Sequence, residues 1–265
     1  MSAIVAAIPV PKARTSWFRR PLLVLGLAGM ALYAADTVAA AKVSYLPIDV
    51  PFERFIQSVN WGPLVQFFMF VDWLGGWHQQ VLGIAGILLV AAVNWRGVPL
   101  MVVGALSGAI YSITEMVIQR PRPSGNLVHV IVHTGSFSYP SGHVAFFSWF
   151  LILLMVCLAV GRLPKAIVAA TWVLAALVLL AVGIGRIYLG EHWPSDVVGG
   201  LALGLGWTAL ALSVRLLSNP DLTAMGYFFR ARAGLESRRT ESASDVQPNP
   251  SARPPTTSLG QCSPR

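Results

Sequence analysis

Residues 165–187 read KAIVAATWVLAALVLLAVGIGRI, and no charged side chain lies between Lys165 and Arg186. A helix needs roughly 20 apolar residues to cross the hydrocarbon core of a bilayer, so this stretch predicts a transmembrane helix. Five further apolar blocks occupy residues 21–41, 79–95, 97–118, 141–160 and 196–217. The sequence therefore predicts an all-α, polytopic membrane bundle of about six transmembrane helices.

The composition agrees with a membrane protein, because 55% of the residues are hydrophobic and only 11% are charged. A soluble domain carries about 25% charged residues. The net charge of +8 is not gathered in one patch, which argues against a nucleic-acid partner. We expect three segments: a cytoplasmic segment 1–20, a membrane-embedded domain 21–218, and a polar tail 219–265 that is disordered and cytoplasmic.

Two parts of the chain allow alternative interpretations. Residues 50–76 mix apolar and polar positions at helical spacing, which fits one or two helices at the membrane interface or a re-entrant segment. The first block follows Arg19 and Arg20 and ends in Ala39-Ala40-Ala41, which resembles a signal-peptidase site. It is either a retained span or a cleaved leader, and in both cases the chain after residue 41 emerges on the far side.

The distribution of basic residues predicts the orientation. With the N-terminus inside, fourteen of the nineteen Lys and Arg residues fall on the inner side, as the positive-inside rule requires. The outer set is Lys42, Arg54, Arg120, Arg122 and Arg186. Both termini are therefore expected in the cytoplasm, and the membrane is expected to be the inner (plasma) membrane of a bacterium.

Three polar clusters lie at the outer ends of the predicted spans. The first, Gln119-Arg120-Pro121-Arg122-Pro123, could simply end and anchor a helix at the interface. The second runs from Ser138 to His143, in the order SYPSGH. A Ser141 cap with free backbone N–H groups at Gly142 would bind an anion, and His143 would transfer a proton. An ordinary N-cap followed by an interfacial histidine is the simpler alternative.

The third cluster comprises Arg186, His192 and Asp196. A histidine beside a carboxylate has its tautomer fixed and its other nitrogen free to act as a base or nucleophile, although a purely structural His–Asp pair fits as well. Together the three clusters place arginines, a helix N-terminus, two histidines and an aspartate on one membrane face. A phosphate ester needs this combination, because guanidinium groups neutralise its oxygens and two histidines supply a nucleophile and an acid.

These motifs, in this order and at these spacings, resemble the type 2 phosphatidic acid phosphatase superfamily, which also contains the vanadium haloperoxidases. The resemblance covers roughly residues 60–215 and implies a helical core, no metal ion or other cofactor, and a phosphohistidine intermediate. It implies His192 as the nucleophile, Asp196 as its orienting carboxylate and His143 as the general acid. The phosphate oxygens would be held by Arg122, Arg186, Ser141 and the Gly142 N–H.

Two positions depart from the family pattern. The family has a lysine seven residues before the second arginine of the first motif, and this position is Glu115 here. Glu115 could pair with Arg120 or Arg122, or bind a cationic part of an unusual substrate, and Arg120 could supply the missing positive charge. The family serine before the third-motif arginine is Gly185 here.

The resulting expectation is a metal-independent lipid phosphate or diphosphate phosphatase that acts on the extracytoplasmic leaflet. A polyprenyl diphosphate, such as undecaprenyl diphosphate, is the leading substrate, with phosphatidate and phosphatidylglycerol phosphate as alternatives. A phosphotransferase to a lipid or alcohol acceptor and a non-catalytic lipid-phosphate-binding relative are the alternative functions. The expected partners are the lipid substrate and the bilayer.

Overall fold

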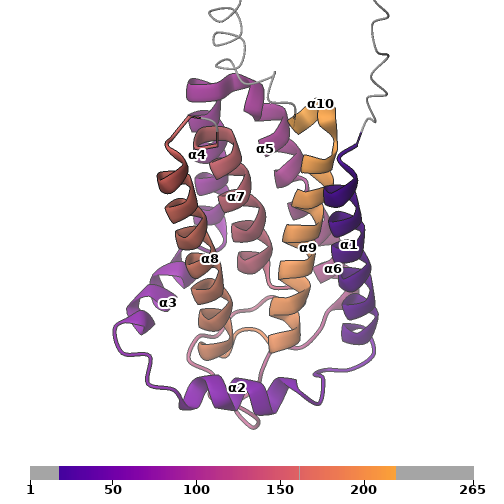
Figure 1. Ribbon diagram of the computed structural model, residues 1–265. Helices are drawn as coiled ribbons and strands as arrows, with labels where there is room; N and C mark the ends of the chain where they lie inside the picture. The colour runs from indigo at the N-terminus through magenta and orange to yellow at the C-terminus, as the bar shows by residue number, and fades with distance from the viewer. Residues whose placement is uncertain (1–17, 161, 219–265) are drawn as a thin grey trace, which may run out of the picture. The chain divides into compact units, whose positions relative to one another are not determined.

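The computed structural model describes residues 18–160 and 162–218, and the predicted tail 219–265 and most of segment 1–20 lie outside these residues. Apart from one isolated β-bridge between Phe18 and Val214, the regular structure of these residues is helical, as predicted (Figure 1). The helices are α1 (Arg20–Ala40), α2 (Asp49–Ser58), α3 (Leu64–Trp73), α4 (Trp77–Asn94), η1 (Trp95–Gly97), α5 (Val98–Ala105), α6 (Ser107–Ile118), α7 (Gly142–Leu158), α8 (Lys165–Tyr188), α9 (Pro194–Ser213) and α10 (Arg215–Ser218).

Four helical runs among the described residues are long and apolar enough to cross a membrane, rather than the six predicted. They are Arg20–Ala40, Trp77–Ile118, Lys165–Tyr188 and Pro194–Ser213. The predicted second and third spans fall within the single run Trp77–Ile118, which η1 interrupts near its middle. The predicted fourth span is α7, which is apolar but has only 17 residues. The count differs because two predicted spans are continuous in one helical run and because α7 is shorter than its apolar block.

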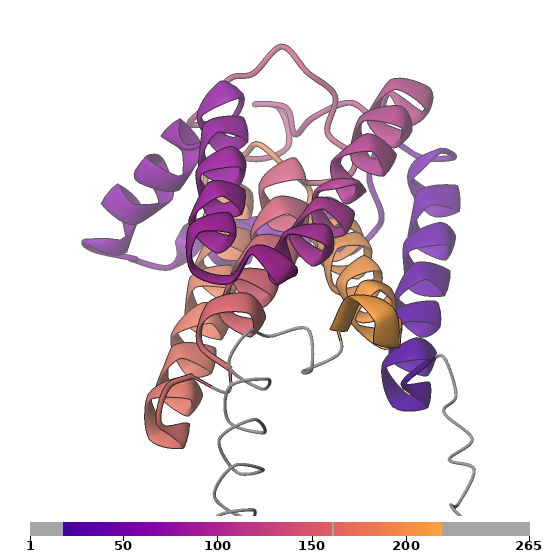
Figure 2. The same cartoon turned by 90° about the horizontal axis from the view of Figure 1, so that it is seen from above.

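Helix α7 forms the centre of the bundle (Figure 2). Its sequence is apolar on every side, and a helix of this kind must be covered all round by apolar neighbours. Val144 and Leu153 are fully buried, and α7 packs against α4, α5, α8 and α9. The central position of α7 fixes the place of its N-terminal residues, Gly142 and His143, at the end of the bundle where α9 also begins.

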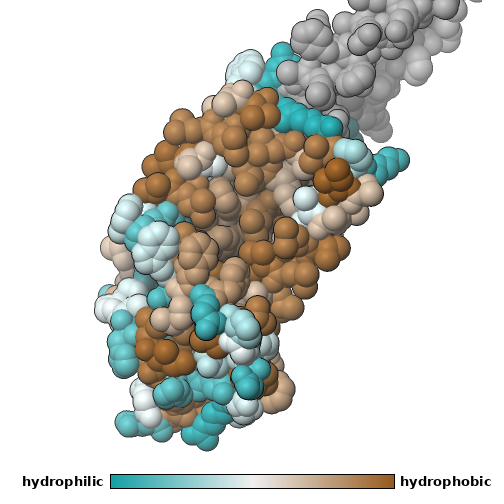
Figure 3. All heavy atoms as spheres, turned by 90° about the vertical axis from the view of Figure 1, so that its left-hand side faces the viewer, coloured by the Kyte–Doolittle hydropathy of each residue, from teal (hydrophilic) through white to brown (hydrophobic). Residues whose placement is uncertain are grey.

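The outer surface of the bundle is apolar. Large side chains on α1, α4 and α8 are more than half exposed, among them Leu25, Leu88 and Leu174. Figure 3 shows a broad apolar band on one face, and polar side chains gather toward the end that carries α2. Such a contiguous apolar surface on a monomer marks contact with lipid or protein, which agrees with the predicted membrane domain.

Residues 49–73 contain two helices, α2 and α3. One of the interpretations of residues 50–76 predicted one or two helices here. Helix α2 lies across the end of the bundle, below the first residues of α9 in Figure 1. It buries Asp49, Glu53 and Ile56, which recur at helical spacing, and exposes Phe52 and Phe55. Helix α2 thereby delivers two carboxyl groups to the interior at the N-terminal end of α9.

The first and last long helices pack closely because glycines allow it. A Cβ atom built on Gly29 of α1 would lie 2.7 Å from the Gly206 Cα atom of α9, so the two backbones touch at this point. Small residues at such crossings let membrane helices approach closely. At the N-terminus of α1, the Arg19 N–H donates to the Ser213 carbonyl oxygen over 2.8 Å.

We predict that Gly29→Ala destabilises the protein, because the added methyl group would push two backbones apart. Overpacking costs about 1–3 kcal/mol, which outweighs the gain of about 1 kcal/mol in helix propensity. Gly108→Ala on α6 is the matched control, since its Cβ would enter open space. Thermal unfolding in detergent should show a lower midpoint for Gly29→Ala than for wild type, and an unchanged or higher midpoint for Gly108→Ala. Equal midpoints for the two variants would contradict the close crossing.

Candidate active site

His192 lies in the short connection between α8 and α9 and is 3% exposed. Its Nδ1 atom is 2.7 Å from the carbonyl oxygen of Ser138. A carbonyl oxygen only accepts hydrogen bonds, so Nδ1 carries the proton and Nε2 keeps its lone pair. The Nε2 atom lies 3.4 Å from Nη1 of Arg122. The ring therefore presents an unprotonated nitrogen toward a guanidinium group.

The charges around His192 keep it neutral. Burial lowers its pKa well below the usual value, and the positive charges of Arg122 and Arg186 lower the pKa further. A neutral imidazole is the form that can act as a nucleophile. The predicted nucleophile is thus held in a suitable tautomer and charge state.

Asp196 does not bond directly to His192, in contrast to the expected His–Asp pair. The nearest carboxylate oxygen is 3.9 Å from His192 Nδ1. Both oxygens of Asp196 are occupied by other donors: the Ser138 hydroxyl group, the Arg120 guanidinium group and the Trp193 backbone N–H. Asp196 therefore acts on His192 indirectly. It binds the Ser138 hydroxyl group, and the Ser138 carbonyl oxygen binds the imidazole ring.

Arg120, which the sequence suggested as a substrate-binding cation, lies in a buried network of ion pairs and hydrogen bonds. Its side chain is 1% exposed and forms ion pairs with Asp49 of α2 and Asp196 of α9. It also donates to the Ser195 hydroxyl group and to the Ser44 carbonyl oxygen. Four of the five N–H donors of Arg120 are thus bound within the protein, and the side chain is buried among these partners.

Arg122 lies beside His192, as expected for a phosphate-binding residue. Its guanidinium group is held by donation to the Glu191 carbonyl oxygen over 2.6 Å and to the Ser136 carbonyl oxygen and hydroxyl group. These contacts come from the loop before α7 and from the connection before α9. They fix the planar group in a position next to the His192 Nε2 atom.

Arg186, near the end of α8, is fully buried, and its two terminal nitrogen atoms form hydrogen bonds. Its Nη1 atom donates to Asp72 of α3 over 3.0 Å and to Glu191 over 2.9 Å, and its Nη2 atom donates to the Phe68 carbonyl oxygen. Its Nε–H group is buried and has no hydrogen-bond partner among the described residues. A buried unpaired donor costs about 1–3 kcal/mol, and an anion beside it would remove this cost.

The start of α7 carries two more unpaired groups. The Ser141 hydroxyl group, which was expected to cap the helix, makes no capping bond and is buried without a partner among residues 18–160 and 162–218. The Nε2 atom of His143 is likewise buried without a partner in the described part of the chain. The backbone N–H of Ser141 donates to the Asp196 carbonyl oxygen over 3.0 Å, which ties the start of α7 to α9.

The three predicted clusters thus meet at one end of the bundle. Arg122, Arg186, Ser141 and His143 contribute groups around His192, and Gly142 begins α7 between two of them. Free N–H groups at a helix N-terminus attract anions. The arrangement provides two guanidinium groups, a helix N-terminus, a hydroxyl group and two imidazoles, which together suit a phosphate group.

Several residues that support the site were not predicted from the sequence. They are Asp49, Asp72, Glu191 and the carbonyl oxygen of Ser138. Glu191 could have been noted because it directly precedes His192. Asp49 and Asp72 lie on the predicted interfacial helices, and nothing in the sequence indicates which carboxylate meets which arginine.

Glu115 forms no ion pair with an arginine within the described residues, so the expected pairing is absent. The side chains of Arg120 and Arg122 are directed to the partners given above. The Glu115 Oε1 atom is buried and has no hydrogen-bond partner in the same part of the structure. At the position that the family fills with a cation, this chain therefore has a carboxyl group beside the Tyr111 hydroxyl group, with one oxygen unpaired among the described residues.

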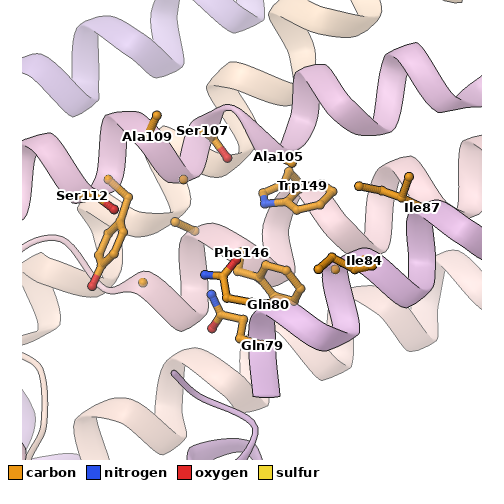
Figure 4. A pocket seen from close by; sticks show the side chains of 15 residues that line it. Gln79, Gln80, Ile84, Ile87, Ala105, Ser107, Ala109, Ser112, Phe146 and Trp149 are labelled. Atoms are coloured by element: carbon orange, nitrogen blue, oxygen red, sulfur yellow. The ribbon is translucent and has the colours of Figure 1, made fainter. Parts of the chain in front are cut away.

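A cavity of about 370 Å³ reaches the start of α7 between α4, α6 and α7 (Figure 4). Near Gly142 its wall contains the polar side chains of Tyr111 and Ser112. Elsewhere the wall combines the amides of Gln79 and Gln80 with apolar groups, namely Ile84, Ile87, Phe146 and Trp149. The cavity can therefore accommodate a molecule that is partly polar and partly apolar.

A family model described as "PAP2 superfamily" matches residues 96–219, which contain all three motifs. A phosphatidylglycerophosphatase B of Bacillus subtilis is 30% identical over 119 residues, or 42% of this chain and 54% of the relative. An undecaprenyl-diphosphatase of Sulfolobus acidocaldarius is 32% identical over 95 residues, or 36% of this chain and 41% of the relative. The matches thus span about half or less of the length of these curated relatives.

A solved structure has a similar fold. It is the crystal structure of a transmembrane PAP2-type phosphatidylglycerolphosphate phosphatase from Bacillus subtilis. The TM-score is 0.55 at 23% sequence identity, and the alignment covers 73% of this chain and 94% of that one. Together with the four apolar helical runs, this similarity identifies the chain as a multi-pass integral membrane protein.

We predict that anion binding at this site weakens as the pH rises through neutrality. Burial raises the pKa of Glu191 to about 7; the nearby Asp72 adds to the rise, while the positive charge of Arg186 opposes it. Glu191 therefore carries a proton below pH 7 and loses it above. The new negative charge pairs with Arg186 and repels an anion.

Sulfate is the suitable probe, because it keeps its charge of −2 between pH 6 and pH 8. Isothermal titration in detergent should give a several-fold weaker sulfate affinity at pH 8 than at pH 6 for wild type, and a smaller change for Glu191→Gln. An identical pH dependence in the two proteins would show that Glu191 does not control the site.

Proposed function

Because residues 96–219 belong to the PAP2 superfamily, we propose that this protein hydrolyses a lipid phosphate monoester or diphosphate in the membrane. One observation carries the proposal. Ser141, His143 and Arg186, at the end of the bundle, hold buried polar atoms that have no partner in the part of the chain that the structure describes. They lie next to a histidine with an unprotonated Nε2 atom. Buried polar groups are nearly always paired in folded proteins, so these atoms are arranged for a ligand.

In the first half of the proposed reaction, His192 Nε2 attacks the phosphorus atom. A P–N bond forms, and the P–O bond to the leaving group breaks; the leaving group is the lipid alcohol of a monoester or the lipid monophosphate of a diphosphate. The leaving oxygen takes a proton from His143, which acts as the general acid. Arg122, Arg186 and the N-terminus of α7 stabilise the negative charge that builds up on the phosphate oxygens.

In the second half, water attacks the phosphohistidine and gives its proton to His143. The P–N bond breaks, inorganic phosphate leaves, and His192 returns to its starting state. Asp196 is a positioning residue in this scheme, since it holds Ser138, and Ser138 holds the Nδ1–H of His192. The positive charge that the reaction requires comes from two arginines and a helix N-terminus, and no step uses a metal ion.

The proposed substrates share a phosphate group on a lipid that approaches from the membrane. The polyprenyl diphosphate expected from the sequence is one member of the class, and the name of the Sulfolobus relative supports it. Phosphatidylglycerol phosphate is another, and the name of the Bacillus relative supports it. We further propose that the chain crosses the membrane six times and that the site faces the extracytoplasmic side, as the distribution of basic residues favours.

We predict that His192→Ala lowers phosphate release by a thousandfold or more, because no other side chain beside Arg122 can accept the phosphoryl group. Phosphate release from polyprenyl diphosphate, phosphatidate and phosphatidylglycerol phosphate should be measured with the full chain in detergent and with excess chelator. His133→Ala, an exposed change in the loop before α7, is the control and should retain full activity. One tenth of wild-type activity in His192→Ala would refute the nucleophile, and loss of wild-type activity in chelator would refute the metal-free mechanism.

The orientation has its own test. A single cysteine at Gly125, in a variant without other cysteines, should react with a membrane-impermeant thiol reagent added to intact cells. A single cysteine at Arg96 in η1, on the opposite side in the proposed topology, should react only after the cells are permeabilised. The reverse pattern would place the site in the cytoplasm.

A further inference from the structure

Glu115 lies on α6 at the position where the family pattern has a lysine, and its carboxyl group lies beside the Tyr111 hydroxyl group. Its Oε1 atom is buried without a partner among the described residues. Arg122, one of the two arginines in the proposed phosphate site, directs hydrogen bonds to Ser136 and Glu191. A carboxyl group in this state needs a hydrogen-bond donor, and the chain as described does not supply one to Oε1.

Tyr111 connects Glu115 to the phosphate site. It lies one helical turn before Glu115, and its hydroxyl group is a neighbour of the Glu115 carboxyl group. A Cβ atom built on Gly142 would lie 2.9 Å from Cζ of Tyr111 and 3.1 Å from its hydroxyl oxygen. The tyrosine therefore packs directly against the first residue of α7, and Glu115 is placed within one side chain of the proposed phosphate position.

The cavity beside these residues has a polar part between the phosphate end and its apolar wall. Tyr111 and Ser112 line it near Gly142, and the amides of Gln79 and Gln80 line it from α4. In Figure 4, Gln79 and Gln80 lie next to Phe146, whereas Ile84, Ile87 and Trp149 form an apolar side. A molecule in this cavity would meet polar groups before its hydrocarbon part reaches apolar ones.

The unpaired Glu115 oxygen limits which chemical groups can lie next to the phosphate of a substrate. A substrate with its phosphate attached directly to a hydrocarbon chain brings only negative charge and apolar carbon to Glu115. A second phosphate, as in a diphosphate, increases the repulsion. A hydroxyl or ammonium group on the carbon skeleton beside the phosphate would instead donate to the unpaired oxygen, and a charge-assisted hydrogen bond of this kind is among the stronger polar contacts.

We propose that Glu115 is a specificity-determining residue that selects lipid phosphates whose head group carries a hydroxyl or ammonium donor next to the phosphate. Glu115 selects against lipids whose phosphate or diphosphate is attached directly to a hydrocarbon chain. The inference rests on the proposed phosphatase function and narrows its substrate class. It favours a polyol or amino-sugar phosphate over the polyprenyl diphosphate expected from the sequence.

The test compares kcat/KM for matched substrates in detergent. Phosphatidylglycerol phosphate carries a hydroxyl group beside its terminal phosphate, and its deoxy analogue lacks only this group. An O-acylated glucosamine 1-phosphate with a free amino group supplies the ammonium donor, and polyprenyl monophosphate and diphosphate supply phosphates without a neighbouring donor. Wild type should prefer the donor-bearing substrates by about tenfold or more, because a site built to bond a donor rejects analogues that lack it. The substrate with the higher kcat/KM shows whether the site prefers a hydroxyl or an ammonium donor.

Two substitutions connect the preference to Glu115. Glu115→Ala should reduce the preference for the hydroxyl-bearing lipid over its deoxy analogue by about tenfold, and Glu115→Lys should also raise kcat/KM for polyprenyl diphosphate. Met116→Ala, a 70% exposed neighbour on the same helix, is the control and should leave every ratio unchanged. Thermal unfolding in detergent identifies a variant that has lost its fold, in which case Glu115→Leu, which fills more of the space but has no hydrogen-bond acceptor, replaces Glu115→Ala.

The outcomes separate this inference from the proposed function. Equal kcat/KM values for phosphatidylglycerol phosphate and its deoxy analogue, or an equal loss with all substrates in Glu115→Ala, would overturn the role of Glu115. The phosphatase function would stand in that case if release still depended on His192. No phosphate release from any of the five substrates, or release that persists in His192→Ala, would overturn both.

Discussion

The buried guanidinium group of Arg120 is the interaction on which the site depends. It joins Asp49 of α2 to Asp196 of α9 inside a region that excludes water. Removing one partner of such a buried pair costs about 3–5 kcal/mol, because the remaining charge is left without compensation. The effects extend from there: Asp196 fixes Ser138, the Ser138 carbonyl oxygen selects the tautomer of His192, and His192 faces Arg122. A charge that touches no substrate thus determines the protonation of the proposed nucleophile.

Much of the fold follows from composition and apolar patterning alone. The helical class, the two short helices within residues 50–76 and the long apolar runs can be predicted, because a bilayer imposes helix length and internal backbone hydrogen bonding. The number of spans is harder to predict. The end of an apolar block and the end of a helix differ: η1 interrupts a continuous run, and α7 begins at Gly142 and stops after 17 residues.

The residues of the site could be predicted as a set, but their individual partners could not. Arg122, His192 and His143 lie where the motif spacing requires. Arg120 and Asp196 have different contacts from those expected, because Asp49 comes from a segment far away in the sequence and a backbone carbonyl oxygen occupies the position expected for a carboxylate. A motif specifies residue types at intervals, whereas a hydrogen-bond network depends on which distant donors arrive at the same place.

The packing of α1 along α9 has a consequence for how the protein is made. Each helix is threaded into the membrane as the ribosome produces it, and α9 is the last long helix of the described chain to emerge. Until then Gly29 of α1 has no helix to pack against, and Arg120 cannot form its ion pair with Asp196. The contact between His192 and the Ser138 carbonyl oxygen is also missing. The reactive centre is therefore assembled only after synthesis of the bundle is complete, and a chain truncated before residue 196 would insert into the membrane but remain inert.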